Sequence, residues 1–577
     1  MIQTNETSGG LHPASQIESK DHPSERSVVI VGGGLAGLAA AVEMASNGLR
    51  VTLVEQNEHL GGKMNLLEDR GFAFDMGPTI ITMPQVFRGI LERAGRRPED
   101  YCELVDLDPQ WRCFFEDGTV IDLRRDAEAF ARELDQQFPA ARPGAGYRAF
   151  VEYSRRMFRL SERVFFYKDL GAIGDLMKSP PNDPGLLGDV LAMRMHSTVG
   201  ATIAKHIKEP HLAQLCEHFL QYVGSSPFLA PAILSLIAAA QVDNGCWYPM
   251  GKPGPGGEPT PGGTRMIART LAAVAAELGV EVRTGVRVAK IMSESGRATG
   301  VMLEGGRTIL ADAVVSNCDV QRTYRDLSSG PAADKAFDAV RSKYEPACSG
   351  LVLYLGLNRP YEHLAHHNFC FSGDSHDEFH DIYKKGIPAR DPTLYIAAPS
   401  RTDPGQAPEI DGQPGEALYV LIHTAYKREG QRWEGPGGML ERYRPVVIEK
   451  MKRMGMADIE ERIVCEHHLT PDGIDRMYNA EGGAIYGLAS HGKLAGGFKP
   501  RNRSKAIRGL YLAGGSANPG PGVPMVLMSG VTAGRAVCED LGVAPKGEPT
   551  AAEPDAIPAG SRRLVSDPAA TGQPEPV

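Results

Sequence analysis

The sequence contains 577 residues, carries a formal net charge of -9 at pH 7 and has a predicted isoelectric point of 6.0. Hydrophobic residues make up 42% and charged residues 23% of the chain, which is typical of a globular protein with more than one domain. Nucleic-acid binding is set aside, because neutralising phosphates needs clustered Lys and Arg.

The composition of the two chain ends and the spacing of the cysteines indicate the class of protein and its compartment. Residues 1–26 and 545–577 are rich in small, polar and acidic residues and are predicted to be disordered tails. The first tail lacks the apolar core of a secretory signal. The nine cysteines include no C-x-x-C pair, which indicates neither a disulfide framework nor a zinc cage. We therefore expect a protein of the reducing cytoplasm.

Any membrane contact is expected to be peripheral. The longest strongly apolar run, residues 227–242, contains two prolines and is shorter than the roughly 20 residues that cross a bilayer. Residues 155–168 combine basic and large apolar side chains at near-helical spacing. This pattern fits either a helix on a membrane surface or a solvated helix face over an ordinary core.

The first predicted elements form a βαβ unit. Residues 27–31 read as a short buried strand, residues 35–47 as a helix with alanines along one side, and residues 50–55 as a second strand. This succession is the opening unit of a dinucleotide-binding fold.

After residue 55 the sequence no longer shows the strand–helix–strand succession of this unit. Residues 111–123 alternate like a hairpin around Asp117-Gly118, and residues 127–207 read mainly as helices. Strand character returns over residues 280–290 and 299–316, which can rejoin the first sheet.

A second region outside the nucleotide-binding pattern covers about 344–499 and contains apolar strands such as 350–357 and 417–423. A last predicted strand at 509–514 and a last predicted helix at 524–541 follow this region. We predict the α/β class, with a Rossmann-like nucleotide-binding domain and an inserted α+β substrate domain. The predicted nucleotide-binding segments are 27–110, 266–330 and 500–544, and the substrate-binding segments, which include any membrane-docking helices, are 111–265 and 331–499.

A glycine-rich turn joins the first strand to the first helix. Gly32-Gly33-Gly34-Leu35-Ala36-Gly37 contains G-x-G-x-x-G. Gly32 permits the tight turn, Gly34 lets the backbone approach a pyrophosphate, and Gly37 allows close helix packing. Glu55 lies 21 residues after Gly34, where its carboxylate can accept hydrogen bonds from a ribose 2'-OH and would repel a 2'-phosphate. A bound nucleotide other than NADP is predicted.

A second loop of small residues favours FAD over NAD. Leu60-Gly61-Gly62-Lys63-Met64 follows the acidic residue, and residues 71–78 add Gly77 and Pro78. Such a loop suits FAD, because its pyrophosphate and ribityl chain run further along the protein than a nicotinamide cofactor does.

Residues 31–78 and 510–530 resemble the flavin amine oxidase and bacterial phytoene desaturase superfamily, and the similarity extends over about 27–541. The resemblance implies bound FAD and a substrate domain that accepts a carotenoid or another long isoprenoid. The usual arginine after the Gly-Gly pair is Lys63 here, which loses a bidentate contact but keeps a positive charge near the pyrophosphate. The residues expected at the cofactor are Gly32, Gly34, Leu35, Ala36, Gly37, Glu55, Gln56, Gly62, Lys63, Gly77, Pro78, Val288, Gly514, Gly515, Val523, Pro524 and Met525.

A closer resemblance is to the branch that oxidises the terminal methyl group of C30 carotenoids, the diaponeurosporene and diapolycopene oxygenases. It rests on residues 110–112, 115–119, 222–226, 365–369, 483–487 and 517–520. Ala517-Asn518-Pro519-Gly520 stands where desaturases of the group show a Thr-His-Pro-Gly-type sequence, which favours an oxygenase. The alternatives are a carotenoid desaturase and a non-catalytic carotenoid-binding flavoprotein.

The resemblance implies oxidation of a polyene end to an alcohol or aldehyde. Oxygen or a membrane quinone would accept the electrons, and the protein would sit on the inner face of the cell membrane. The catalytic residues are left unassigned, because a conjugated polyene delocalises the positive charge left by hydride transfer without a side-chain acid or base.

Two sets of side chains allow a structural and a functional interpretation. The pairs His366-His367 and His467-His468 are read as hydrogen-bonded histidines and no metal is expected, because neighbours in a strand point to opposite faces. Large aromatic side chains either line a carotenoid tunnel or fill an ordinary core. The candidates are Trp111, Trp247 and Tyr248.

Overall fold

The computed structural model describes residues 26–172, 175, 193–194, 196–252, 260–492 and 496–551, together with the backbone of 561–565. Most of both predicted tails, residues 1–25, 552–560 and 566–577, lies outside the described residues.

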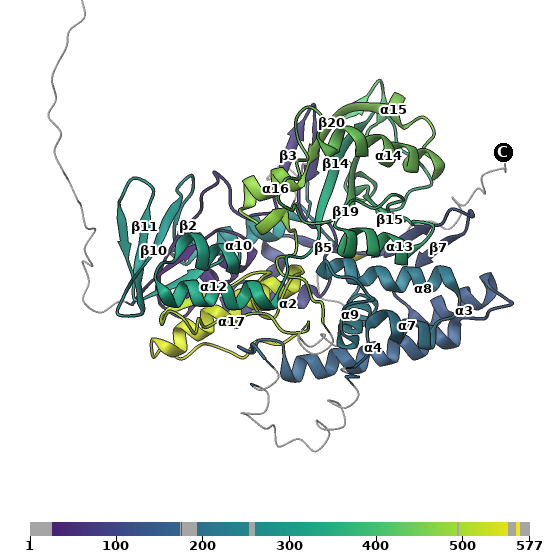
Figure 1. Cartoon of the computed structure of the whole chain (residues 1–577). Helices are drawn as coiled ribbons and strands as arrows, with labels where there is room; N and C mark the ends of the chain where they lie inside the picture. Colours follow the sequence, from purple (N-terminus) through teal and green to yellow (C-terminus); the bar gives the residue numbers. More distant parts are fainter. Residues whose placement is uncertain are drawn as a thin grey trace, which may run out of the picture.

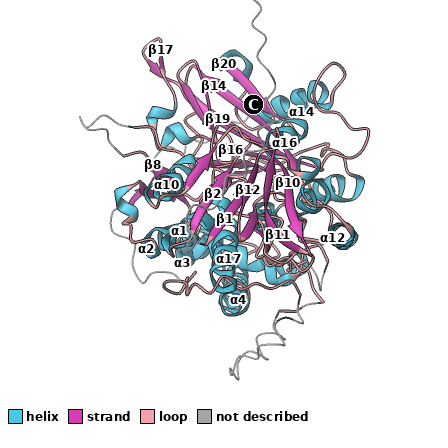
Figure 2. Ribbon diagram, turned by 90° about the vertical axis from the view of Figure 1, so that its left-hand side faces the viewer, coloured by secondary structure: helices cyan, strands magenta, loops and turns pink. Residues whose placement is uncertain are grey.

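One half of the molecule is built on a five-stranded parallel sheet (Figures 1 and 2). Its first two strands flank α1 (Leu35–Ser46), which confirms the predicted βαβ unit. Two strands from the middle of the chain and one from its end complete the sheet, so three distant segments share one set of backbone hydrogen bonds. The strands in spatial order are β21 (Leu510–Leu512), β13 (Ala313–Ser316), β1 (Ser27–Val31), β2 (Arg50–Val54) and β9 (Glu281–Arg283).

Helix α17 (Val523–Asp540) packs along α1. The approach is close because small residues lie at the contact: a Cβ added at Gly530 would stand 2.2 Å from the carbonyl oxygen of Ala36. Figure 1 shows α17 in yellow, whereas the buried residues Ala333 and Val340 of α12 (Pro331–Lys343) belong to a second hydrophobic cluster that includes Val29 and Val31 of β1. The helix predicted for the C-terminus thus packs on the half of the molecule that contains the parallel sheet.

The other half contains a seven-stranded sheet. Its long strands β14 and β19 are buried along their whole length, which explains their continuous apolar character. The predicted hairpin is correct and forms one edge of this sheet as β6 and β7. The strands in spatial order are β20 (Ile463–Leu469), β14 (Ser349–Leu357), β19 (Glu416–Thr424), β16 (Leu394–Ala397), β15 (His367–Cys370), β6 (Trp111–Phe114) and β7 (Val120–Leu123).

A group of helices lies below this sheet in Figure 1. In the longest, α4, the apolar residues Met157, Leu160 and Val164 are buried in the main core. Within the described chain, none of the helices is both long and apolar enough to cross a bilayer. The group comprises α3 (Ala127–Gln137), α4 (Gly144–Val164), α7 (Val199–His206), α8 (Pro210–Glu217) and α9 (Leu236–Asn244).

A small sheet joins parts of the chain that the sequence assigns to different regions. β5 (Glu103–Asp108) pairs antiparallel with β8 (Trp247–Met250), although one lies in the predicted nucleotide-binding range and the other in the substrate range. β22 (Ser561–Val565) pairs with β5 in parallel. These residues lie within the C-terminal tail that is predicted to be disordered from its composition, and a composition argument carries no information about backbone pairing with a distant strand.

The remaining strands and helices extend these two halves. They include β3 (Leu66–Asp69), β4 (Phe72–Asp75), β10 (Val288–Glu294), β11 (Arg297–Leu303), β12 (Thr308–Leu310), α2 (Pro84–Arg93), α10 (Arg265–Glu277), α13 (Ser375–His380), α14 (Met439–Arg453) and α16 (Pro471–Tyr478).

Candidate active site

A single continuous cavity connects the glycine loops of the parallel sheet with an apolar region beside β14 and β19. Its volume is about 680 Å³, within the range of small-molecule sites. Every residue predicted at the cofactor lines this cavity except Gly37. The aromatic residues of the lining are Phe165, Phe166, Tyr222, Phe369, Tyr395, Tyr419, Tyr478 and Tyr486.

The N-terminus of α1 can receive an anion. Its N-cap residue, Gly34, has an extended backbone and no side-chain cap, and the first turn holds no acidic residue. The backbone N–H groups of Leu35 and Ala36 have no partner among the described residues, whereas Gly37 donates to the Asn317 side chain. The first two N–H groups can therefore bind a negatively charged group. Gly32 has φ 99°, which favours glycine, and a Cβ at Gly37 would stand 2.1 Å from the carbonyl oxygen of Gly32. A pyrophosphate fits this turn.

Glu55 is held in place at the end of β2 by backbone groups. Its Oε2 accepts from the backbone N–H of Gly33 at 2.8 Å, and its Oε1 accepts from the backbone N–H of Asn57 at 2.8 Å. Oε1 also accepts from Asn57 Nδ2 at 2.9 Å, whereas Oε2 keeps a second lone pair for another donor. The residue lines the cavity, so the carboxylate can receive a ribose hydroxyl there.

The second glycine loop lies directly against the first. Gly61 donates its backbone N–H to the carbonyl oxygen of Gly33 at 2.8 Å. Lys63 donates to the carbonyl oxygen of Ile485 at 2.8 Å, which connects the loop to the substrate half. Burial lowers the pKa of the Lys63 ammonium to about 8, partly offset by the charge of Asp319. An adjacent pyrophosphate would favour its charged form.

Asn317 is a cavity residue that the sequence argument misses. It follows β13 directly, at the carboxyl end of a strand next to β1, where ligands bind in α/β sheets. Its Oδ1 accepts from the backbone N–H of Gly37 at 3.0 Å, and its Nδ2 donates to the carbonyl oxygen of Ala513 at 3.1 Å. The sequence feature that could have identified Asn317 is its position directly after the apolar strand β13.

The aromatic lining differs from the three predicted candidates. Trp111, Trp247 and Tyr248 are buried but do not line the cavity. Trp111 lies one layer behind the wall, where its indole Nε1 donates to the Tyr222 hydroxyl at 3.1 Å. The core interpretation is correct for these three, because burial of a large ring does not identify which neighbours enclose it.

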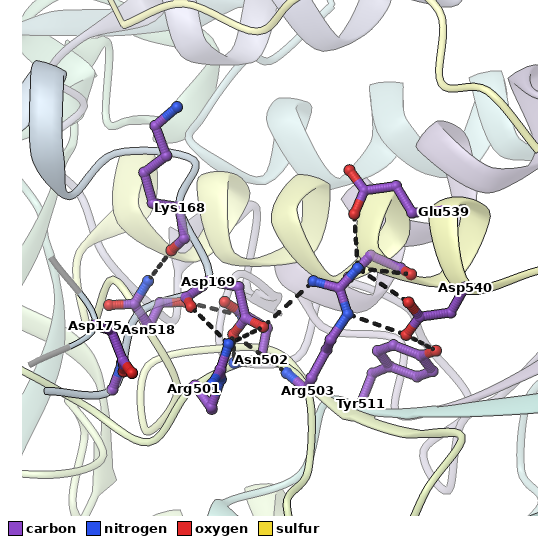
Figure 3. A network of polar contacts seen from close by, with 12 residues as sticks. Lys168, Asp169, Asp175, Arg501, Asn502, Arg503, Tyr511, Asn518, Glu539 and Asp540 are labelled. Atoms are coloured by element: carbon purple, nitrogen blue, oxygen red, sulfur yellow. Dashed lines mark hydrogen bonds and ion pairs between the residues drawn. The ribbon is translucent and has the colours of Figure 1, made fainter. Parts of the chain in front are cut away.

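A network that follows the end of α4 joins the helical group to the C-terminal part of the chain (Figure 3). Asp169 accepts from the backbone N–H of Asn502 at 2.7 Å and pairs with Arg501 at 3.0 Å and Arg503 at 3.4 Å. The Asn518 amide donates to the carbonyl oxygen of Lys168 at 2.6 Å. Asn518, part of the segment that distinguishes this chain from the desaturase pattern, therefore fixes a loop next to the cavity.

Three of the four histidines in these pairs have protein partners. His366 Nδ1 lies 2.6 Å from the Thr402 hydroxyl, His367 Nδ1 lies 2.9 Å from the Tyr395 hydroxyl, and His467 Nε2 lies 2.9 Å from Asp69. Across the part of the chain that the structure describes, no three His, Cys, Asp or Glu residues are grouped to hold a metal ion.

Comparison with known proteins agrees with this site. The model of the flavin containing amine oxidoreductase family matches residues 35–538. The chain is 37% identical to the 4,4'-diapolycopene oxygenase of a Methylomonas species, over 89% of this chain and 98% of the relative. It is 35% identical to the 4,4'-diaponeurosporene oxygenase of Staphylococcus haemolyticus, over 88% and 96%.

Solved structures show the same fold at low sequence identity. An oxidoreductase from Methanosarcina mazei has a TM-score of 0.55 and 17% identity, covering 88% of this chain and 99% of that chain. Putrescine oxidase bound to putrescine has a TM-score of 0.55 and 12% identity, covering 90% and 99%. The chain belongs to the flavin containing amine oxidoreductase family. It is an FAD-dependent oxidoreductase with the fold of the flavin amine oxidases.

Proposed function

We propose that this protein oxidises the terminal methyl group of a C30 polyene to an alcohol and then an aldehyde. The observation that carries the proposal is the continuity of the cavity, which joins a pyrophosphate-compatible glycine turn to an apolar, aromatic wall. A long apolar substrate can therefore reach a bound cofactor without leaving the protein. The names of the oxygenase relatives support this substrate and reaction.

In this proposal FAD occupies the glycine-lined end and supplies a two-electron acceptor. The backbone N–H groups of Leu35 and Ala36 and the Lys63 ammonium would bind the pyrophosphate, and Glu55 would accept a hydrogen bond from the ribose. The aromatic wall would orient one end of the polyene beside the cofactor. Oxidation of the methyl group together with one water molecule would give the alcohol and reduce one FAD to FADH2, and oxidation of the alcohol to the aldehyde would reduce a second. The wider cofactor contacts are the residues predicted from the sequence, and the two domains are the predicted segments 27–110, 266–330 and 500–544, and 111–265 and 331–499.

Electron acceptor and location belong to the same proposal. A polyene of this kind is dissolved in a membrane, so we infer peripheral contact with the bilayer and transfer of electrons to oxygen or a membrane quinone. The buried apolar face of α4 argues against that face as the contact surface, because its side chains already fill the core.

The proposal is tested in cells that make a C30 polyene and express this chain. We expect polar terminal alcohols or aldehydes, identified by mass spectrometry as gain of oxygen at unchanged carbon number. Loss of hydrogen pairs alone, with a longer chromophore, would indicate a desaturase. Cells expressing Gly34→Val are the control, because a Cβ at position 34 would stand 2.7 Å from Asn317 Oδ1 and a branched side chain would fill the space of the pyrophosphate.

An experiment on the purified holoenzyme distinguishes an enzyme that oxidises the polyene from a flavoprotein that only binds it. Under anaerobic conditions in liposomes, the flavin absorbance of a catalyst bleaches when the polyene is added. Stable polyene binding without bleaching would favour the carotenoid-binding flavoprotein.

A further inference from the structure

A histidine interrupts the apolar wall of the cavity. Tyr419, Leu421 and His423 alternate along β19 and all line the cavity, because residues two apart in a strand share one face. The rest of β19 is buried and largely apolar. A polar ring at this place is costly unless its nitrogens find partners.

Within the described chain, one of the two ring nitrogens of His423 has a protein partner. His423 Nε2 lies 3.1 Å from the hydroxyl oxygen of Tyr486, and the two rings are stacked with centroids 5.8 Å apart. His423 Nδ1 makes no hydrogen bond to any residue that the structure describes. It therefore retains its capacity to pair with a ligand in the cavity.

Both members of this pair are neutral at pH 7. Burial lowers the pKa of His423 to about 4, and burial raises the pKa of the Tyr486 hydroxyl well above its ordinary value. When the Tyr486 hydroxyl donates to Nε2, the ring proton resides on Nδ1; in the other tautomer Nδ1 is an acceptor. A hydroxyl group can pair with either form, since it both donates and accepts.

Tyr486 places the pair at the junction of the two halves of the cavity. A Cβ at the next residue, Gly487, would stand 2.8 Å from the backbone nitrogen of Ser516, and a Cβ at Gly515 would stand 3.4 Å from the carbonyl oxygen of Tyr486. Gly515 and Ser516 line the cofactor end. The polar pair therefore lies where the apolar wall meets the C-terminal cofactor loop.

We propose that His423, oriented by Tyr486, binds the hydroxyl oxygen of a primary allylic alcohol at the end of a polyene. This subsite rests on the proposed function and extends it, because it retains the first oxidation product beside the cofactor for a second oxidation. The parent hydrocarbon has no group that can form a hydrogen bond with His423. The enzyme therefore binds the terminal alcohol more tightly than the hydrocarbon of equal length.

The test measures binding without turnover. The holoenzyme is reduced beforehand, so that substrate is not consumed, and its affinities for a C30 polyene with one terminal hydroxyl and for the matching hydrocarbon are measured by partition from liposomes. In His423→Phe, which keeps a ring against Tyr486, we expect about tenfold weaker binding of the alcohol and unchanged binding of the hydrocarbon. In His423→Gln, a retained polar group restores part of the preference for the alcohol.

Leu421→Met is the matched control on the same strand face. It changes the shape of the wall but no polar group, so the two affinities shift by the same factor. Tyr486→Phe keeps the ring and removes the hydroxyl that orients His423; we expect a smaller loss of preference than in His423→Phe.

A second readout is the product ratio. His423→Phe releases a larger share of alcohol and a smaller share of aldehyde than the wild type. An unchanged alcohol-to-hydrocarbon affinity ratio in His423→Phe overturns the subsite, and indicates that the histidine pairs only with water. A wild-type enzyme that adds no oxygen overturns the proposed function instead, while the affinity ratio still decides the subsite.

Discussion

Gly37 donates its backbone N–H to the Asn317 side chain at 3.0 Å, across 280 positions of sequence. Because Asn317 Nδ2 also donates to the carbonyl oxygen of Ala513, one amide connects the first glycine turn to the C-terminal cofactor segment. The two ends of the proposed cofactor site are therefore linked by a residue from the middle of the chain.

Replacing Asn317 should weaken FAD binding. In Asn317→Leu both hydrogen bonds are lost and the amide is replaced by an apolar group of similar size. We expect the Kd for FAD to rise about ten- to a hundredfold, measured by quenching of flavin fluorescence on titration of the apoprotein. Asn47→Ala, at the other end of α1 where Asn47 Nδ2 bonds to the Glu43 carbonyl oxygen, should leave this Kd unchanged. Equal Kd values for Asn317→Leu and wild type would show that the two hydrogen bonds of Asn317 do not contribute to FAD binding.

The affinity for FAD should depend on pH through Lys63. Its pKa is about 8 without the cofactor, and a pyrophosphate stabilises the ammonium and raises this pKa. FAD binding then takes up a proton above pH 8. The affinity is therefore highest below pH 8 and falls as the pH rises, by up to about tenfold per unit.

Lys63→Arg separates this effect from other titrations. The guanidinium stays protonated throughout the range, so the decline of FAD affinity above pH 8 should disappear. Lys63→Met should bind FAD weakly and without the decline. A wild-type Kd that is constant across pH 8 would contradict a contact between Lys63 and the pyrophosphate.

Asp169 should stabilise the junction between α4 and the cofactor segment. Asp169→Ala removes the acceptor for the Asn502 backbone N–H and the ion pairs with Arg501 and Arg503. We expect a loss of stability of roughly 1–3 kcal/mol, seen as a lower midpoint of thermal unfolding of the holoprotein. Asp169→Asn keeps an oxygen acceptor for the N–H and should lose less. Identical midpoints for the two variants would mean that the backbone hydrogen bond contributes nothing.

The buried pair of Asp75 and Arg265 should be sensitive to loss of one partner. Their closest atoms lie 2.9 Å apart, with side chains only 5% and 4% exposed, and Asp75 also accepts from the Thr264 backbone N–H. Arg265→Met leaves a buried carboxylate unpaired, at a cost of about 3–5 kcal/mol.

The double variant Asp75→Asn with Arg265→Met should recover part of the loss, because no buried charge remains. Chemical denaturation of the three proteins measures this. A double variant less stable than Arg265→Met would show that the lone Asp75 carboxylate stabilises the fold, through its hydrogen bond from the Thr264 backbone N–H, more than its unpaired charge costs.

The sequence by itself determined the glycine turn, the first helix and the acid at the end of β2. These features depend on residues close together in the chain: a φ of 99° at Gly32 and the spacing from Gly34 to Glu55 are local consequences of covalent geometry and helix length. The resemblance to a known family added the residues of the C-terminal segment to the predicted cofactor site, because the motif of that segment is also continuous in the sequence. FAD and the class of reaction followed from such local patterns.

Only the tertiary structure decided which side chains meet across the chain. Asn317, Asp169 and His423 each owe their place to partners more than sixty positions away. A strand pattern predicts which face is buried but not which element covers it, so Trp111 was placed in the core and Tyr222 in the wall only by packing. Whether a polar atom finds a partner is likewise decided by elements that assemble from distant segments, which is why the free nitrogen of His423 could not be predicted.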